Sequence, residues 1–183
     1  RTLASRISDE VLMHSVEFGV VSFRPDDTQV KSIVVYRDDL AFVVNPRHPL
    51  ASSGKVSIRQ LGTQNFIAHN VPSPQRQKVI QTFKRHKTPL QMGVELPSLE
   101  AIKRFVEMGN GVALVPGLTV RPELKSGALV QVQIAELQIE RKLRLVYRRQ
   151  ANLSHAALSF LKVVEAYAAQ HGDPYCFQVE RGA

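Results

Sequence analysis

The sequence predicts an α/β fold with a mostly parallel sheet, because short apolar strands alternate with helix-period segments along most of the chain. The clearest unit lies between residues 92 and 116. The apolar run Met92–Leu96 predicts a strand, a helix follows from Leu99, and Val112–Val115 predicts a second strand that Pro116 closes. The chain has 183 residues, of which 44% are hydrophobic and 22% charged. This is enough for one large domain or two small lobes.

The helix of this βαβ unit has recognisable start and stop signals. Ser98 precedes it, and a serine hydroxyl at this position can accept a backbone N–H two or three residues further on. Gly109 predicts a left-handed stop at its end. The apolar positions recur at helical spacing, at Leu99, Ile102, Phe105 and Val106.

Before this unit, the sequence predicts a helix over 2–15, strands over 16–23 and 30–36, a turn at 37–39 and a strand over 40–45. Helical turns over 56–61 and a strand over 65–69 follow. The next helix is capped by Ser73 and has Pro74 in its first position. After it come a helix over 118–124, strands over 129–134 and 141–149, and a helix that Ser154 caps and Gly172 ends. Residues 173–183 are polar and predict a loose tail.

Cysteine content and apolar runs restrict the compartment. The single cysteine, Cys176, excludes an internal disulfide and fits a reducing cytoplasm. Every apolar run is shorter than the ~20 residues that a membrane span needs, and no secretion leader is visible. We therefore expect a cytoplasmic protein that does not bind a membrane. The sequence lacks an initiator methionine and opens in a predicted helix, so we expect a fragment of a longer protein.

The formal charge of +8 raises the question of nucleic-acid binding. However, the basic residues are dispersed, and the densest cluster, Lys84–Lys87, ends an amphipathic helix, where cations complement the helix dipole. A solvated helix end is the preferred interpretation of that cluster. A positive field that attracts a small anion is the alternative.

No pattern of catalytic or metal-binding residues is present in the sequence. It contains neither a Gly-x-Ser-x-Gly elbow nor a Gly-x-x-x-x-Gly-Lys phosphate loop. Its six histidines are scattered, and one cysteine cannot build a zinc site. Cys176 as a nucleophile is disfavoured by its place in a polar tail. We therefore expect neither an enzyme, nor a cofactor, nor a metal.

Polar residues at strand ends are the candidates for ligand binding. Ligands of open α/β sheets gather at the carboxyl ends of strands, where helix N-termini offer free N–H groups to anions. Ser73 and Ser98 occupy such positions, and each either contacts a ligand or only caps its helix. His69 and Asn70 end a predicted strand. His69 as a buried, hydrogen-bonded ring is the alternative to a ligand contact.

Three motifs carry a family resemblance. They are Ser-x-x-x-Ile-x-x-x-Val-x-x-Gly-x-Gly-Val-Ala-Leu-Val-Pro over 98–116, Leu-Ala-Phe-Val-Val-Asn-Pro-Arg-His-Pro-Leu-Ala over 40–51, and Val-Glu-Phe-Gly-Val-Val-Ser over 16–22. In this order and spacing, the chain from about residue 2 to residue 170 resembles the ligand-sensing domain of LysR-type transcriptional regulators. Ser22 then aligns with a hydroxyl residue that contacts the effector in several members of that family.

The resemblance implies two Rossmann-like lobes joined by crossover strands, as in periplasmic binding proteins. Lobe I would hold 1–34 and 139–170, lobe II 35–138, and 171–183 would be a flexible tail. The family's first strand, first helix and second strand, and its N-terminal winged helix, have no counterpart in this sequence.

The resemblance also implies a function. The domain would bind a small anionic metabolite in the interlobe cleft and would control DNA binding through the winged helix of a parent protein. That parent would be a homodimer or homotetramer. A free solute receptor of the same fold is the alternative, and a direct nucleic-acid binder is the third hypothesis.

Overall fold

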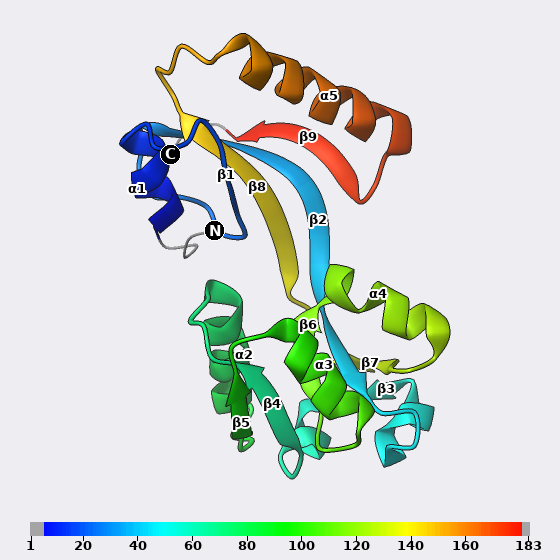
Figure 1. Cartoon of the computed structure of the whole chain (residues 1–183). Coiled ribbons are helices and arrows are strands. Elements are labelled where there is room, and N and C mark those ends of the chain that lie inside the picture. The colour runs from blue at the N-terminus through cyan, green and yellow to red at the C-terminus, as the bar shows by residue number, and fades with distance from the viewer. Residues whose placement is uncertain (1–5, 181–183) are drawn as a thin grey trace. The chain divides into compact units, whose positions relative to one another are not determined.

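The computed structural model describes residues 6–180 and shows an α/β protein (Figure 1). Its elements are, in order, α1 (Ile7–Leu12), β1 (Gly19–Val21), β2 (Val30–Val44), η2 (Pro49–Ser53), β3 (Lys55–Val56), η3 (Ile58–Leu61), β4 (Asn65–His69), α2 (Pro74–Arg85), β5 (Gln91–Leu96), α3 (Leu99–Glu107), β6 (Ala113–Pro116), α4 (Gly117–Ser126), β7 (Val130–Ile134), β8 (Glu140–Arg148), α5 (His155–His171) and β9 (Tyr175–Glu180).

The chain divides into two compact units. Unit 1 contains the described residues up to Asp38 and those from Arg141 onward, and unit 2 is Asp39–Glu140. The sequence had placed the divisions at 34/35 and 138/139.

Unit 1 is built on antiparallel ladders. β1 pairs with β8, and β9 pairs with the first half of β2. α1 contacts β1, and α5 lies along β9 (Figure 1). The small core under α1 consists of Val11, Val21, Val30 and Val146. The helix expected over 2–15 is described only from Ile7 to Leu12, and its first residues lie outside the described part of the chain.

The turn predicted at 37–39 is wrong, because β2 runs unbroken through these residues. Charged residues in sequence predicted a turn. In the structure, however, the carboxylate of Asp38 is buried and accepts a hydrogen bond from the Arg141 guanidinium at 3.4 Å. Arg141 lies 103 residues away in the sequence, so a partner that local reasoning cannot see allows the charge to lie within a strand.

The loose tail predicted for 173–183 is also wrong over residues 175–180, which form β9. The Glu180 carboxylate accepts hydrogen bonds from Arg144 Nε at 2.9 Å and from Ser32 Oγ at 2.8 Å. Burial alone would raise the pKa of Glu180, but these hydrogen bonds outweigh burial and lower it. The signal was present in the sequence, because Tyr175, Phe177 and Val179 alternate with more polar residues at the period of a strand.

Unit 2 has the mostly parallel strand arrangement that the sequence predicted, with β2 as the exception. β6 and β7 are antiparallel to β2, whereas β3 is parallel to β7 and β4 is parallel to β5. A parallel bridge between Phe66 and Val112 joins β4 to the start of β6. The chain enters unit 2 along β2. The other strands of unit 2, β3 to β7, run in the direction opposite to β2. Two apolar clusters fill the interior, one around Phe42, Phe66 and Phe83 and the other around Ile102 and Val106.

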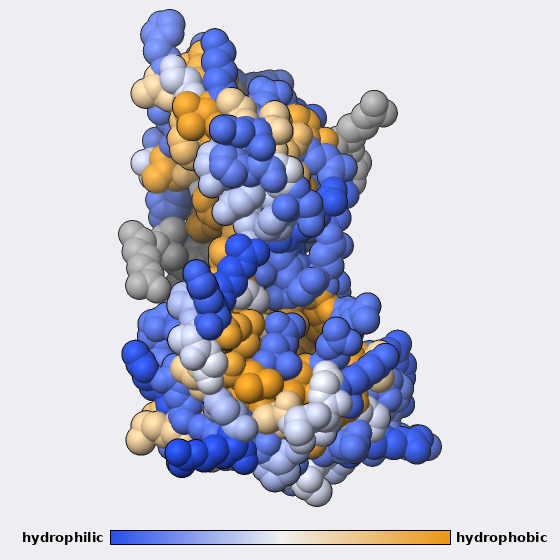
Figure 2. Space-filling model, turned by 90° about the vertical axis from the view of Figure 1, so that its right-hand side faces the viewer, coloured by the Kyte–Doolittle hydropathy of each residue, from blue (hydrophilic) through white to orange (hydrophobic). Residues whose placement is uncertain are grey.

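α5 leaves an apolar surface exposed in unit 1. Its fully buried residues are only two alanines, and larger apolar side chains reach solvent. Figure 2 shows apolar groups among the hydrophilic ones in the upper part of the view, at the height of α5. The exposed residues of this helix are Leu158, Phe160, Val163 and Tyr167. Of the helices that the structure describes, none has the length and apolar character of a membrane span.

Candidate functional site

Two helices of unit 2 begin directly after two neighbouring strand ends. β4 and β5 are parallel, and their last residues, His69 and Leu96, are register partners. α2 begins at Pro74 and α3 at Leu99, so both helix N-termini follow the same edge of this small sheet. Free backbone N–H groups and the positive ends of two helix dipoles are therefore presented at that edge.

The two serines that precede these helices behave differently. Ser73 Oγ accepts a hydrogen bond from Arg76 N at 3.1 Å, so Ser73 caps α2 as predicted. Ser98 is the N-cap residue of α3 by position, but its side chain makes no capping hydrogen bond. Its backbone carbonyl accepts from Ile102 N at 3.1 Å, and its hydroxyl is exposed. The expected cap at Ser98 is therefore wrong, and this hydroxyl is available to a ligand.

Hydrogen bonds tie the two strand ends together. The half-buried ring of His69 places Nε2 3.2 Å from the carbonyl oxygen of Pro97, and Asn70 N donates to Leu96 O at 3.1 Å. The Asn70 side chain is exposed. His69 thus fixes the turn before α3 and is hydrogen-bonded, as the alternative from sequence stated. It can still approach a ligand because the ring is only half covered.

Arg76 is not a free cation at this edge. Its Nη2 lies 2.6 Å from Glu95 Oε1, and its Nη1 donates to the backbone carbonyl of His69. The guanidinium therefore connects the end of β4 to β5, and its charge is already paired at this edge with a carboxylate of the same unit.

The structure brings together most of the residues that the sequence selected. His69, Asn70, Ser73 and Ser98 gather around the ends of β4 and β5. Ser22 directly follows β1 in unit 1, and it is described only as part of that unit.

A third helix start, predicted at 118, was not selected as a site candidate by sequence reasoning. β6 is joined in parallel to β4 by the Phe66–Val112 bridge, and α4 begins immediately after it at Gly117. Thr119 Oγ1 donates to Pro116 O at 2.7 Å, and Lys103 Nζ donates to Thr119 O at 3.0 Å. The first turn of α4 is therefore anchored at the same side of the sheet. A strand closed by proline with threonine three residues later was the available signal.

Within residues 6–180, no group of three or more histidine, cysteine or acidic side chains is arranged to hold a metal ion.

The different roles of the two serines give a stability prediction. Ser73→Ala removes a formed cap and should lower the free energy of unfolding by about 1 kcal/mol. Ser98→Ala removes no capping bond and should change it by less than about 0.5 kcal/mol. Equilibrium urea unfolding of the unliganded variants measures both values. An equal loss in the two variants would contradict the assignment of roles.

A family model described as the LysR substrate binding domain matches residues 2–169. The chain belongs to this family. Its motifs at 16–22, 40–51 and 98–116 were therefore identified correctly, and its fold is the periplasmic-binding-protein-like fold of LysR regulatory domains. The division of the chain into two units agrees with that architecture in kind.

Named relatives of this LysR domain are transcriptional regulators. The RuBisCO operon transcriptional regulator of Allochromatium vinosum is 28% identical over 86% of the chain and 52% of its own length. The HTH-type transcriptional regulator CbbR of Cereibacter sphaeroides is 31% identical over 84% of the chain and 50% of its own length. The chain thus spans about half the length of the curated relatives it matches.

Solved structures agree on the fold. The CcmR regulatory domain of Synechocystis PCC6803, solved in complex with 2-PG, has a TM-score of 0.82 and 24% identity, and the match covers 93% of this chain and 82% of that one. The effector binding domain of QuiR, solved in complex with shikimate, has a TM-score of 0.77 and 17% identity, over 93% of this chain and 80% of that one.

Proposed function

We propose that this LysR domain senses a small anionic metabolite, which binds at the edge of unit 2 where α2 and α3 begin. The observation that carries the proposal is the exposed Ser98 hydroxyl, which precedes a helix without capping it. A serine at a helix start ordinarily satisfies one of the first N–H groups of that helix. Here the first N–H groups of α3 lack this cap, and they and the hydroxyl remain available to a bound oxyanion.

The charge of the surroundings favours an anion. The carboxylate nearest to these strand ends in sequence, Glu95, is engaged with Arg76, so its negative charge is largely compensated. The chain carries a formal charge of +8, which attracts anions over distance. Shikimate, the ligand in the QuiR complex, is itself a carboxylate. Asn70 and His69 add donors beside the helix starts.

Control of transcription would follow from a population shift. A ligand changes an equilibrium only if it binds one arrangement of the protein better than another. We infer that the effector favours one arrangement of the two units in a parent regulator, whose DNA-binding part lies outside this chain. That parent would act in the cytoplasm as a homodimer or homotetramer. Its relatives are named as transcriptional regulators, which supports this role over a free solute receptor.

A thermal-shift screen of anionic metabolites tests the proposal. 2-PG and shikimate belong in the panel because they occupy related domains. A ligand at one hundred times its dissociation constant should stabilise the chain by about 2.7 kcal/mol, which raises the melting temperature measurably. An uncharged analogue of each hit, in which every ionised group is replaced by a neutral one, should give a much smaller shift.

Ser98→Ala then tests the position of the site. Loss of a hydroxyl contact to a charged ligand should weaken the binding of a hit by about 1.5–3 kcal/mol in calorimetry. Ser154→Ala is the matched control, because Ser154 caps α5 in unit 1 by accepting from Ala157 N at 3.1 Å. That variant should lose stability and keep its affinity. Unchanged affinity in Ser98→Ala would reject this site.

A further inference from the structure

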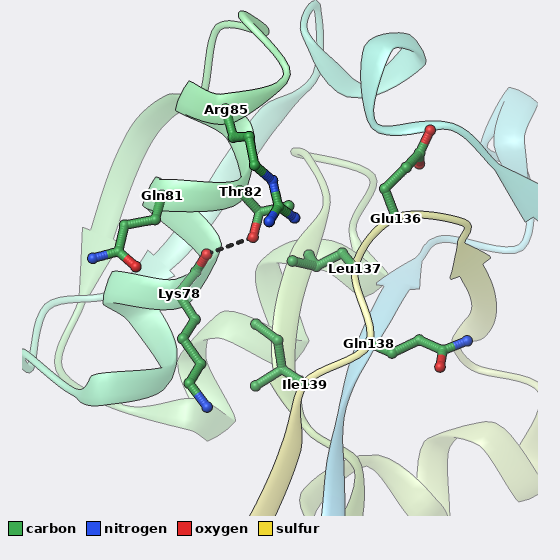
Figure 3. A pocket seen from close by; sticks show the side chains of 8 residues that line it. All are labelled: Lys78, Gln81, Thr82, Arg85, Glu136, Leu137, Gln138 and Ile139. Atoms are coloured by element: carbon green, nitrogen blue, oxygen red, sulfur yellow. Dashed lines mark hydrogen bonds between the residues drawn. The ribbon is translucent and has the colours of Figure 1, made fainter.

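A cavity of unit 2 lies beside the C-terminal half of α2, away from its N-terminus. It has a volume of about 430 Å³ and is enclosed by the last turns of α2 and by the segment between β7 and β8 (Figure 3). This volume falls in the usual range of small-molecule sites, about 300–1,000 Å³. Its lining residues are Lys78, Gln81, Thr82, Arg85, Glu136, Leu137, Gln138 and Ile139.

The floor of the cavity is apolar and held in place. Leu137 and Ile139 are 8% and 6% exposed, and both point toward α2, whereas Gln138 points away (Figure 3). The segment is fixed by backbone hydrogen bonds from Ala135 N to Val56 O at 2.9 Å and from Leu40 N to Ile139 O at 3.1 Å. The floor therefore exists before any ligand binds, which reduces the entropy that binding would lose.

The wall on α2 is cationic. Lys78 and Arg85 lie two helical turns apart on the same face, and among the described residues neither forms an ion pair. Thr82 lies between them, and its Oγ1 donates a hydrogen bond to Lys78 O at 2.8 Å. The acidic lining residue, Glu136, accepts a hydrogen bond from Ile58 N at 2.9 Å, so its carboxylate is held toward η3. The Arg85 guanidinium therefore lies beside Thr82, whereas the Lys78 side chain extends to the opposite end of the lining, and the acidic lining residue is already engaged (Figure 3).

The helix dipole alone would not place an anion here. The C-terminal end of α2 carries partial negative charge, which its basic last turn offsets. One interpretation is that Arg85 only compensates the dipole. Lys84 shares the last turn with Arg85 but lines no cavity, so a comparison of these two residues separates dipole compensation from ligand binding.

We propose that this cavity binds a small organic anion, with its charged group at the Arg85 guanidinium and its hydrocarbon part on Leu137 and Ile139. This site is separate from the helix starts at Ser73 and Ser98 and does not depend on the effector proposed above. The apolar floor selects against a bare inorganic anion, and the cationic wall selects against a neutral or cationic molecule of the same shape.

Three probes with controlled chemistry test the proposal on the whole chain. Hexanoate has both features, hexylammonium has the same chain with the opposite charge, and inorganic phosphate has charge without a hydrocarbon part. In nuclear magnetic resonance titrations, hexanoate should shift the amides of 78–85 and 136–139 saturably, and the other two should leave them nearly unchanged. Equal responses to hexanoate and hexylammonium, or to hexanoate and phosphate, would overturn the assigned ligand class.

Matched variants test the site itself. Arg85→Gln should weaken hexanoate binding about fivefold, as expected for loss of one partly solvated ion pair, while Lys84→Gln should change it less than about twofold. Both substitutions remove one positive charge from the same last turn. An equal loss of hexanoate affinity in Arg85→Gln and Lys84→Gln would show that only the general positive charge of this helix end matters, and it would overturn the proposal. Shifts confined to residues near Ser73 and Ser98 would also overturn it, since they would assign hexanoate to the other site.

Discussion

Gly111→Ala should lower the stability of unit 2 by about 3 kcal/mol or more, because two separate penalties meet at this residue. Its φ is +150°, a value that side-chain-bearing residues rarely adopt. A Cβ there would also lie 2.5 Å from the backbone oxygen of Asn65. That oxygen accepts from Val112 N at 2.9 Å, within the bridge between β4 and β6. The substitution should therefore separate the strands behind the candidate site.

Gly109→Ala is the matched control. Gly109 also has a left-handed φ, +79°, but a Cβ there would meet nothing within 4 Å. Its cost should be about 1 kcal/mol, the backbone penalty alone. Equilibrium urea unfolding and hydrogen exchange of the Ile67 and Val112 amides measure the two variants. Similar losses of stability in both would show that the close approach to Asn65 does not matter.

The sequence predicted elements well where the signals are local. α2, α3 and α5 begin at the residues that Ser73, Ser98 and Ser154 indicated, and β4 has its predicted bounds. Caps, breakers and apolar periodicity depend on residues that are close together in the sequence, so the sequence alone shows the interactions that decide these elements.

The errors arose where distant partners decide. Asp38 lies in a strand because Arg141 pairs with it. β9 has a local alternation of apolar and polar residues, but its pairing with β2 and the Arg144–Glu180 ion pair fix it in the sheet. No local pattern contains these pairs. Strand directions show the same limit. Alternation of strands and helices predicted the parallel strands of unit 2, but it does not show that β2 runs against them or that the ladders of unit 1 are antiparallel.

The candidate site was predictable in part. The rule that ligands gather at strand ends selected His69, Asn70, Ser73 and Ser98, and parallel pairing of β4 with β5 makes them neighbours. The rule could not separate a cap from a free hydroxyl, because Ser73 and Ser98 each follow a proline and precede a helix. The cavity beside Arg85 was not predictable, since its floor comes from a segment more than fifty residues further along the chain.

Lys103→Met should destabilise unit 2 by about 2–4 kcal/mol, because it breaks a largely buried ion pair from one side. Lys103 lies on α3 with a side chain only 6% exposed, and its Nζ is 2.7 Å from Glu123 Oε1 on α4. It also contacts Glu100 at 2.8 Å, but Glu100 is 74% exposed and adds little. Without the ammonium, the carboxylate of Glu123 remains 16% exposed and loses its ionic partner.

Arg104→Met is the control for this loss. Arg104 is the next residue, its side chain is 75% exposed, and it pairs with Glu107 on the same helix. Removing that exposed pair should change stability by less than about 1 kcal/mol. The double variant Lys103→Met/Glu123→Leu should recover most of the lost stability, because it leaves no buried charge. Equal losses in Lys103→Met and Arg104→Met would contradict the importance of burial.

The pH dependence of the stability difference between wild type and Lys103→Met tests whether loss of the Lys103–Glu123 ion pair causes the destabilisation. The hydrogen bond from Lys103 lowers the pKa of Glu123 below its ordinary value of 4.5. The contribution of ionised Glu123 to the free energy of unfolding is therefore complete above pH 4.5 and is lost as pH falls through the lowered pKa. Burial alone would lower the pKa of Lys103, but its hydrogen bonds to Glu100 and Glu123 raise it above 10.5. Its contribution is therefore complete below that value and is lost as pH rises through the raised pKa. The stability difference between wild type and Lys103→Met, measured by urea unfolding, should then be constant from about pH 5 to pH 10 and should narrow at more acidic pH. A difference that stays constant down to pH 2 would assign the loss to altered packing of the lysine stem instead of to the charge.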